Sequence, residues 1–177
     1  MKTCSLYGFI SALAGALLFL ALYFLGYHSD PAKLAAASWI GGLGGLAIVS
    51  VCTALGVKAR RAEVPDAGGF GYGQALGAGV LISLVSSFLS AVFSYAYYAF
   101  INPGFSEIVL QDKMDKLQAK GVSGAQLDQA EKITRFMLSP VPAAVFALIA
   151  GFIVGFIIAL IVAAFLKRPA PAVPPPI

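Results

Sequence analysis

Four long apolar runs without a charged side chain constrain this chain more than any other feature of its sequence. They cover residues 5–27, 34–57, 74–101 and 141–166. A helix needs about 20 predominantly apolar residues to cross the hydrocarbon core of a bilayer. Because the runs are continuous and do not alternate with polar residues, they predict helices rather than barrel strands. The sequence therefore predicts an all-α integral membrane protein with four transmembrane helices.

The composition excludes a soluble enzyme. Apolar residues make up 59% of the chain and charged residues only 11%, whereas about a quarter of a soluble domain is charged. One histidine and two cysteines argue against a histidine-rich metal site and a disulfide framework. We therefore expect no metal and no other cofactor. The net charge of +4 is too modest to indicate a nucleic-acid partner.

The basic residues next to the apolar runs predict the orientation. Those nearest to the runs gather on one side of the predicted membrane: Lys2, Lys58, Arg60, Arg61, Lys167 and Arg168. Cytoplasmic flanks of membrane helices carry an excess of lysine and arginine. The sequence therefore predicts that both termini are cytoplasmic and that residues 104–139 lie outside. Residues 1–168 then form one membrane domain, and the proline-rich residues 169–177 are expected to be a disordered cytoplasmic tail.

Residues 104–139 are predicted to form an extramembrane helical hairpin between the third and fourth transmembrane helices. This segment holds ten of the twenty charged residues of the chain. Gly121 to Gly124 interrupt its helical pattern, and the spacing of Ser123 and Gln126 predicts a capping box at the second helix. An apolar stripe follows the hairpin: Leu110, Met114, Leu117, Leu127, Ile133 and Met137.

The apolar stripe of the hairpin allows two interpretations. The two short helices pack on each other or lie on the lipid headgroups. Alternatively, the stripe faces a partner protein, because amphipathic helices bind grooves through apolar anchors at this spacing. Both interpretations remain open at the level of sequence.

Small residues recur at every third or fourth position in the second and fourth runs. The candidate helix-packing residues are Gly41, Gly45, Ala147, Gly151, Gly155 and Ala159. Small residues let the backbones of membrane helices approach closely. The stripes are expected to pack within this one chain or to form the seam of a homo-oligomer.

Serine residues share one face of the third run. Ser83, Ser87, Ser90 and Ser94 lie at helical spacing. One interpretation is a polar pathway lined by hydroxyl groups. The other is that each hydroxyl bonds to a carbonyl of the preceding turn and that the serines pack as alanine does.

The four runs contain no aspartate, glutamate, lysine, arginine or histidine. An ionisable side chain inside the membrane is the usual mark of an ion path or a reaction site. The one histidine, His28, follows the first run and is expected to be solvated. Because no base is available to activate a serine, we expect a protein that is not an enzyme.

Several short motifs resemble a known family. They are Tyr7–Gly8, Phe70 to Ala75, Tyr98 to Phe105, Ser139–Pro140 and Lys167–Arg168. Together they are similar to a bacterial membrane family known as domain of unknown function 4199. The resemblance implies a four-span protein of the bacterial cytoplasmic (inner) membrane with no assigned activity, so it supplies no site residues.

Two functions are compatible with these features. The first is a non-catalytic accessory or structural subunit, which acts through helix packing and through its outer hairpin. Its partners would be the lipid bilayer and either another membrane protein or further copies of this chain. The alternative is a small oligomeric transporter or channel with a serine-lined third helix.

Overall fold

The computed structural model describes residues 1–65 and 69–168 of the chain. Its elements in chain order are α1 (Lys2–Phe24), η1 (Pro31–Lys33), α2 (Leu34–Ala62), α3 (Tyr72–Ala96), η3 (Tyr97–Ile101), α4 (Phe105–Ala119), α5 (Ala125–Met137) and α6 (Pro140–Leu166). Four segments, containing α1, α2, α3 and α6, are long and apolar enough to cross a membrane. The prediction of a helical protein with four helices of this kind is confirmed. The predicted tail, residues 169–177, lies outside the described part.

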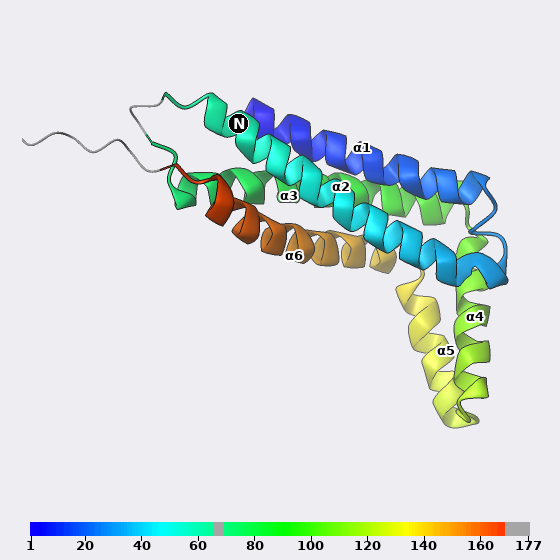
Figure 1. Cartoon of the computed structure of the whole chain (residues 1–177). Coiled ribbons are helices and arrows are strands. Elements are labelled where there is room, and N and C mark those ends of the chain that lie inside the picture. Colours follow the sequence, from blue (N-terminus) through cyan, green and yellow to red (C-terminus); the bar gives the residue numbers. More distant parts are fainter. Residues whose placement is uncertain (66–68, 169–177) are drawn as a thin grey trace, which may run out of the picture.

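The four long helices pack side by side, and α3 contacts each of the other three (Figure 1). At one end the chain leaves α3 through η3 and forms α4 and α5, which contact each other and project crosswise to the long helices. We call this the hairpin end. The opposite end, where α1 begins and α6 stops, is the terminal end.

The most extensive contact between two helices of the described part joins α3 to α6. A Cβ atom added to Gly155 would lie only 2.6 Å from Oγ of Ser83, and one added to Gly79 would lie 2.7 Å from Cβ of Ala159. One turn further along, the Cβ position of Gly151 is 3.4 Å from Cβ of Ser87. The small residues of α6 therefore lie directly against the serine face of α3. Two stripes that the sequence presents separately form one contact.

The serine hydroxyl groups in this contact bond within their own helix. Ser83 Oγ donates to the carbonyl oxygen of Gly79 at 2.9 Å, and Ser87 Oγ donates to that of Leu84 at 3.2 Å. Ser83 and Ser87 are buried, while Ser90 and Ser94 are half-buried. This geometry favours packing over a water-lined pathway, because the hydroxyls already have partners and α6 covers them.

The glycine pattern of α2 differs in its role from that of α6. The Cβ position of Gly45 has no neighbour within 4 Å, and that of Gly41 has only Leu22, at 3.7 Å. The tight contacts of α1 and α2 with α3 occur at other glycines. A Cβ atom on Gly8 would lie 2.8 Å from the carbonyl oxygen of Ile82, and one on Gly56 would lie 2.5 Å from the Cδ1 atom of that residue.

The glycine-rich segment before α3 closes the terminal end. The backbone of Phe70 exchanges two hydrogen bonds with Arg168, at 2.8 and 2.7 Å, and the Phe70 ring is buried. Gln74 then begins α3 by accepting a hydrogen bond from the backbone N–H of Gly71 at 3.2 Å. Arg61 of α2 also reaches the last turn of α6, where it donates to the carbonyl oxygen of Leu166 at 3.2 Å. This segment thereby ties the start of α3 to the end of α6.

The α3–α6 contact predicts that leucine is destabilising at Gly155 and tolerated at Gly45. Gly155→Leu must push α6 away from Ser83 and is expected to lower the free energy of unfolding by about 1–3 kcal/mol, as overpacking does. The control is Gly45→Leu, whose side chain meets open space and should leave stability nearly unchanged. Thermal unfolding in detergent measures both variants. Equal melting temperatures for the two variants would contradict this packing.

Candidate functional site

The single histidine of the chain is buried at the hairpin end. Gly26, with a φ of +78°, turns the chain back after α1. This turn places His28 among the aromatic rings of Phe19, Tyr97 and Phe105. The centre of its ring lies 4.5 Å from those of Phe19 and Phe105, and the residue is 2% exposed. The expectation of a solvated histidine was therefore wrong, because Phe105 at the start of α4 covers it.

His28 is the end of a short chain of hydrogen bonds. Asn102 donates from Nδ2 to the hydroxyl oxygen of Tyr97 at 3.0 Å, and that oxygen lies 2.6 Å from Nδ1 of His28. Because Asn102 already donates to this oxygen, we assign the Tyr97 hydroxyl as donor to Nδ1. Nδ1 is then unprotonated and the remaining ring proton is on Nε2. Burial lowers the pKa of His28, which agrees with a neutral imidazole.

A π-helical turn brings the hydrogen-bonding groups together. In η3 the backbone N–H of Asn102 donates to the carbonyl oxygen of Tyr97 at 2.8 Å, five residues back. A π turn adds a residue to the helix and occurs often at functional sites. Here it returns the Asn102 side chain to the Tyr97 hydroxyl. The sequence gives no sign of it beyond the helix-ending Asn102–Pro103–Gly104.

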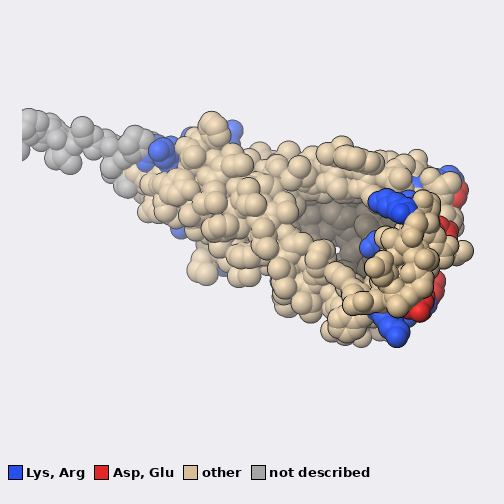
Figure 2. Space-filling model, turned by 90° about the horizontal axis from the view of Figure 1, so that it is seen from below, with Lys and Arg blue, Asp and Glu red and all other residues tan. Residues whose placement is uncertain are grey.

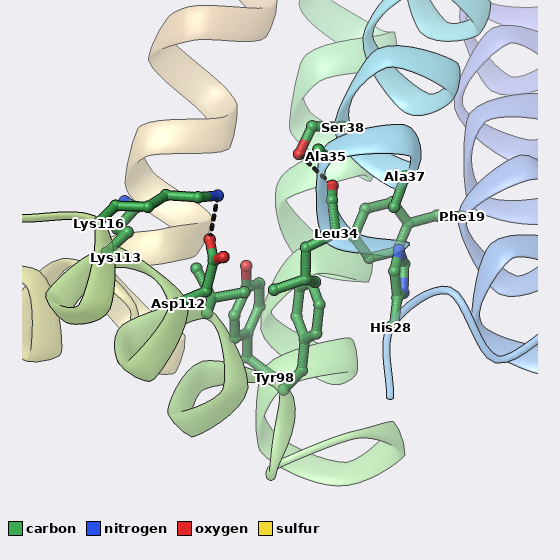
Figure 3. A pocket seen from close by; sticks show the side chains of 12 residues that line it. Phe19, His28, Leu34, Ala35, Ala37, Ser38, Tyr98, Asp112, Lys113 and Lys116 are labelled. Atoms are coloured by element: carbon green, nitrogen blue, oxygen red, sulfur yellow. Dashed lines mark hydrogen bonds and ion pairs between the residues drawn. The ribbon is translucent and has the colours of Figure 1, made fainter. Parts of the chain in front are cut away.

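A cavity of about 570 Å³ adjoins this cluster, between α4 and the hairpin ends of α1 and α2. Its lining residues are Phe19, His28, Leu34, Ala35, Ala37, Ser38, Tyr98, Phe105, Val109, Asp112, Lys113 and Lys116. Figure 2 shows the molecule hollowed beside the projecting hairpin, with basic side chains next to the hollow. Figure 3 shows Lys113 and Lys116 on α4, across the cavity from Phe19 and His28. We call this space the outer cavity.

Charge is confined to the α4 side of the outer cavity. Nζ of Lys116 lies 2.7 Å from Oδ2 of Asp112. Lys113 forms no ion pair with any residue of the described part of the chain. With His28 neutral, these side chains give the cavity a net charge of +1. The opposite wall is formed by apolar side chains, by Ser38 and by the histidine ring.

The apolar stripe of the hairpin divides into two parts. Leu110 is buried, and Met114, Leu117 and Leu127 are half-buried, whereas Ile133 and Met137 are 52% and 47% exposed. An ion pair that sequence spacing did not indicate joins the two helices, because Arg135 Nη1 lies 2.5 Å from Oε1 of Glu107.

The second helix of the hairpin begins differently from its prediction. Its first residue follows Gly124, which has a φ of +59° and occupies the N-cap position. No side chain caps this end, so the predicted capping box of Ser123 and Gln126 was wrong. A glycine replaces it because the backbone there adopts a left-handed φ, which other residues rarely accept.

Comparison with known proteins gives one match. A family model described as a protein of unknown function (DUF4199) matches residues 6–168. The chain belongs to this family. No curated protein and no solved structure matches this chain.

Within residues 1–65 and 69–168, no three histidine, cysteine, aspartate or glutamate residues lie together in a way that could hold a metal ion. The chemistry that the outer cavity does offer is hydrogen bonding and charge: the Nε2 proton of His28 and the ammonium groups of Lys113 and Lys116. These groups suit the binding of an anion.

Burial of His28 predicts that the DUF4199 protein loses stability in acid. The unfolded chain takes up a proton below its ordinary pKa of 6.5, while the folded state, with its lowered pKa, resists protonation. Stability is therefore full above pH 6.5 and falls as the pH decreases, by at most about 1.4 kcal/mol per pH unit for one group. Thermal unfolding at pH 7.5 and pH 5.5 measures this loss.

The control for the acid effect is His28→Phe. His28 is the only histidine of the chain, so this variant should lose most of the difference in melting temperature between the two pH values. If the variant and the unaltered protein show the same difference, titration of His28 does not cause it.

Proposed function

We propose that this chain is a non-catalytic integral membrane protein that serves as an accessory or structural subunit in the bacterial cytoplasmic membrane. Its four long helices are apolar enough to span a bilayer. The four apolar runs carry no ionisable side chain, although membrane reaction sites and ion paths usually depend on one. The buried contact of Ser83 and Ser87 with α6 supports this function over the alternative of a serine-lined transporter.

In this proposal both termini face the cytoplasm and the hairpin lies outside. The support is the cluster of basic residues at the terminal end, where Arg61 and Arg168 both bond to backbone carbonyls. Lysine and arginine next to the helix ends favour the cytoplasmic side. The hairpin end, by contrast, carries acidic and basic residues in equal number, five of each within residues 104–139.

The observation that carries the proposal is the serine face of α3 sealed by α6, and the placement of α5 indicates how the hairpin meets the membrane. The hairpin projects crosswise to the long helices, so it runs along the membrane surface when those helices span the bilayer. α5 lies on the side of α4 that is nearer to the middle of the long helices (Figure 1). The free face of α5 is therefore directed towards the lipid beside them.

The free face of α5 is apolar in the last two turns of the helix. Ile133, Phe136 and Met137 are exposed, Phe136 by 67%, and they span about 100° of the helix circumference. Asp128, Lys132 and Arg135 occupy a different sector of the same helix. A helix with this division of side chains lies in the headgroup region with its apolar face buried. Of the two interpretations of the hairpin, its contact with lipid is thus the one that the geometry supports.

This placement predicts that position 136 contacts lipid and position 128 does not. In a Trp39→Phe background, which removes the only native tryptophan, Phe136→Trp should fluoresce at short wavelength and be quenched by brominated lipids. The apolar face of an interfacial helix enters the bilayer by about 5–10 Å. Fluorescence in reconstituted vesicles measures both properties.

The matched control is Asp128→Trp, an exposed position on the polar face of the same helix. Its emission should match that of tryptophan in water and respond only to a water-soluble quencher. If both positions respond only to the water-soluble quencher, the hairpin stands clear of the membrane, and the apolar face of α5 is left to bind a protein.

A further inference from the structure

We propose that the outer cavity binds the phosphate headgroup of an anionic phospholipid, whose acyl chains lie against the apolar wall formed by α1 and α2. The inference rests on the proposed membrane insertion and extends it to one specific lipid. The volume of the outer cavity, about 570 Å³, falls within the range of small-molecule sites, about 300–1,000 Å³. The support comes from the level of the cavity in the membrane, from its charge and from its polar groups.

The cavity lies at the level where the apolar surface of the long helices ends. Ser38 lines the cavity, and the next residue, Trp39, is 70% exposed on the outside of α2. At the end of α1, Phe24 and Leu25 are 79% and 68% exposed. Tryptophan is enriched where the acyl chains of a bilayer meet the headgroups, so Trp39 marks this level, and Phe24 and Leu25 extend the apolar surface up to it. A ligand at this level therefore meets lipid tails on one side and water on the other.

The charge of the cavity selects an anion. Lys113 has no ion-pair partner in residues 1–65 or 69–168, and Lys116 shares its charge with Asp112 at 2.7 Å. Both ammonium groups belong to α4, which lies along the membrane surface in the proposed orientation. A phosphate group between α4 and α2 would accept hydrogen bonds from both lysines. Lysine binds phosphate in this way as a point charge.

His28 supplies a third donor on the opposite side. Its Nδ1 atom accepts from Tyr97 at 2.6 Å, so the ring is fixed in place and keeps a proton on Nε2. Nε2 has no hydrogen-bond partner in the described part of the chain, and His28 lines the cavity. A neutral imidazole donor suits the ester or phosphate oxygens of a lipid, and it requires no second buried charge.

The apolar wall accommodates the tails. Leu34, Ala35 and Ala37 of α2 and Val109 of α4 line the cavity together with Phe19 and Phe105. An inorganic phosphate ion would leave this wall uncovered, whereas a phospholipid covers it. The combination of a cationic edge and an apolar wall thus fits an anionic amphiphile better than a free anion.

Thermal unfolding of the purified full chain in detergent tests the proposal. Dioleoyl phosphatidylglycerol, dioleoyl phosphatidylcholine and sodium phosphate are each titrated into the protein. Phosphatidylglycerol should raise the melting temperature in a saturable manner, since a ligand that binds only the folded state stabilises it. Phosphatidylcholine and sodium phosphate should have little effect.

Two pairs of variants locate the effect. Lys113→Gln should need about fivefold more phosphatidylglycerol for the same shift, which corresponds to the loss of one lysine–anion contact. Lys120→Gln, an exposed position of the hairpin outside the lining, should behave as the unaltered protein.

Ala35→Trp fills the cavity from an exposed position and should abolish the response. Ala36→Trp, exposed and next to it but outside the lining, should retain it.

Three results would overturn the proposal. An equal shift with phosphatidylcholine would show that the cavity does not select charge. An equal response in Lys113→Gln, Ala35→Trp and the unaltered protein would place the bound lipid elsewhere. A full shift with sodium phosphate alone would make the ligand a free anion. Failure of the proposed membrane insertion can be told apart from failure of lipid binding. If the chain does not insert, the quenching of tryptophan at position 136 by brominated lipids is also lost.

Discussion

The contact between the serine face of α3 and the small residues of α6 holds the rest of the molecule in place. Lipid tails are as apolar as leucine side chains, so membrane helices gain little from burying apolar surface and associate through close backbone approach. Gly155 against Ser83 and Gly79 against Ala159 provide that approach. Once α6 is fixed on α3, the two helices set both ends of the molecule. Phe70 and Arg168 join at the terminal end, and η3 and the start of α6 bound the hairpin at the other.

Hydropathy and turn chemistry predict most of the helices but not which surfaces meet. The uncharged runs and the Ser139–Pro140 start of α6 are local features, and the observed helix bounds lie within a few residues of the predicted ones. The glycine stripes show the limit. Gly45 and Gly155 belong to similar patterns, yet one meets open space and the other meets Ser83. A small residue permits close approach without specifying a partner, so the sequence alone does not distinguish these two roles.

The hydrogen-bonded cluster of His28, Tyr97 and Asn102 at the hairpin end could not be predicted from the sequence, for a different reason. The contact of His28 with Tyr97 joins residues 69 positions apart, and the π turn that brings Asn102 to the same hydroxyl group has no sequence signature here. A histidine near Asp30 suggests a solvated loop. His28 is buried only because Phe105, at the start of α4, packs over its ring. The outer cavity follows from that arrangement, because its walls come from two stretches of the chain, residues 19–38 and 98–116, that are distant in sequence.

The central claim is that α6 seals the serine face of α3, and a disulfide tests it directly. With Cys4 and Cys52 replaced by alanine, Ser87→Cys and Gly151→Cys should form a disulfide on mild oxidation in membranes, because their Cβ positions lie 3.4 Å apart, close to the usual separation of about 3.5–4.5 Å. Mass spectrometry of the linked peptides detects the bond. The account predicts efficient linkage and no reaction of Ser87→Cys alone with a charged, water-soluble thiol reagent. Rapid reaction with that reagent and no linkage would contradict it, and would make the serine face the wall of an aqueous pathway.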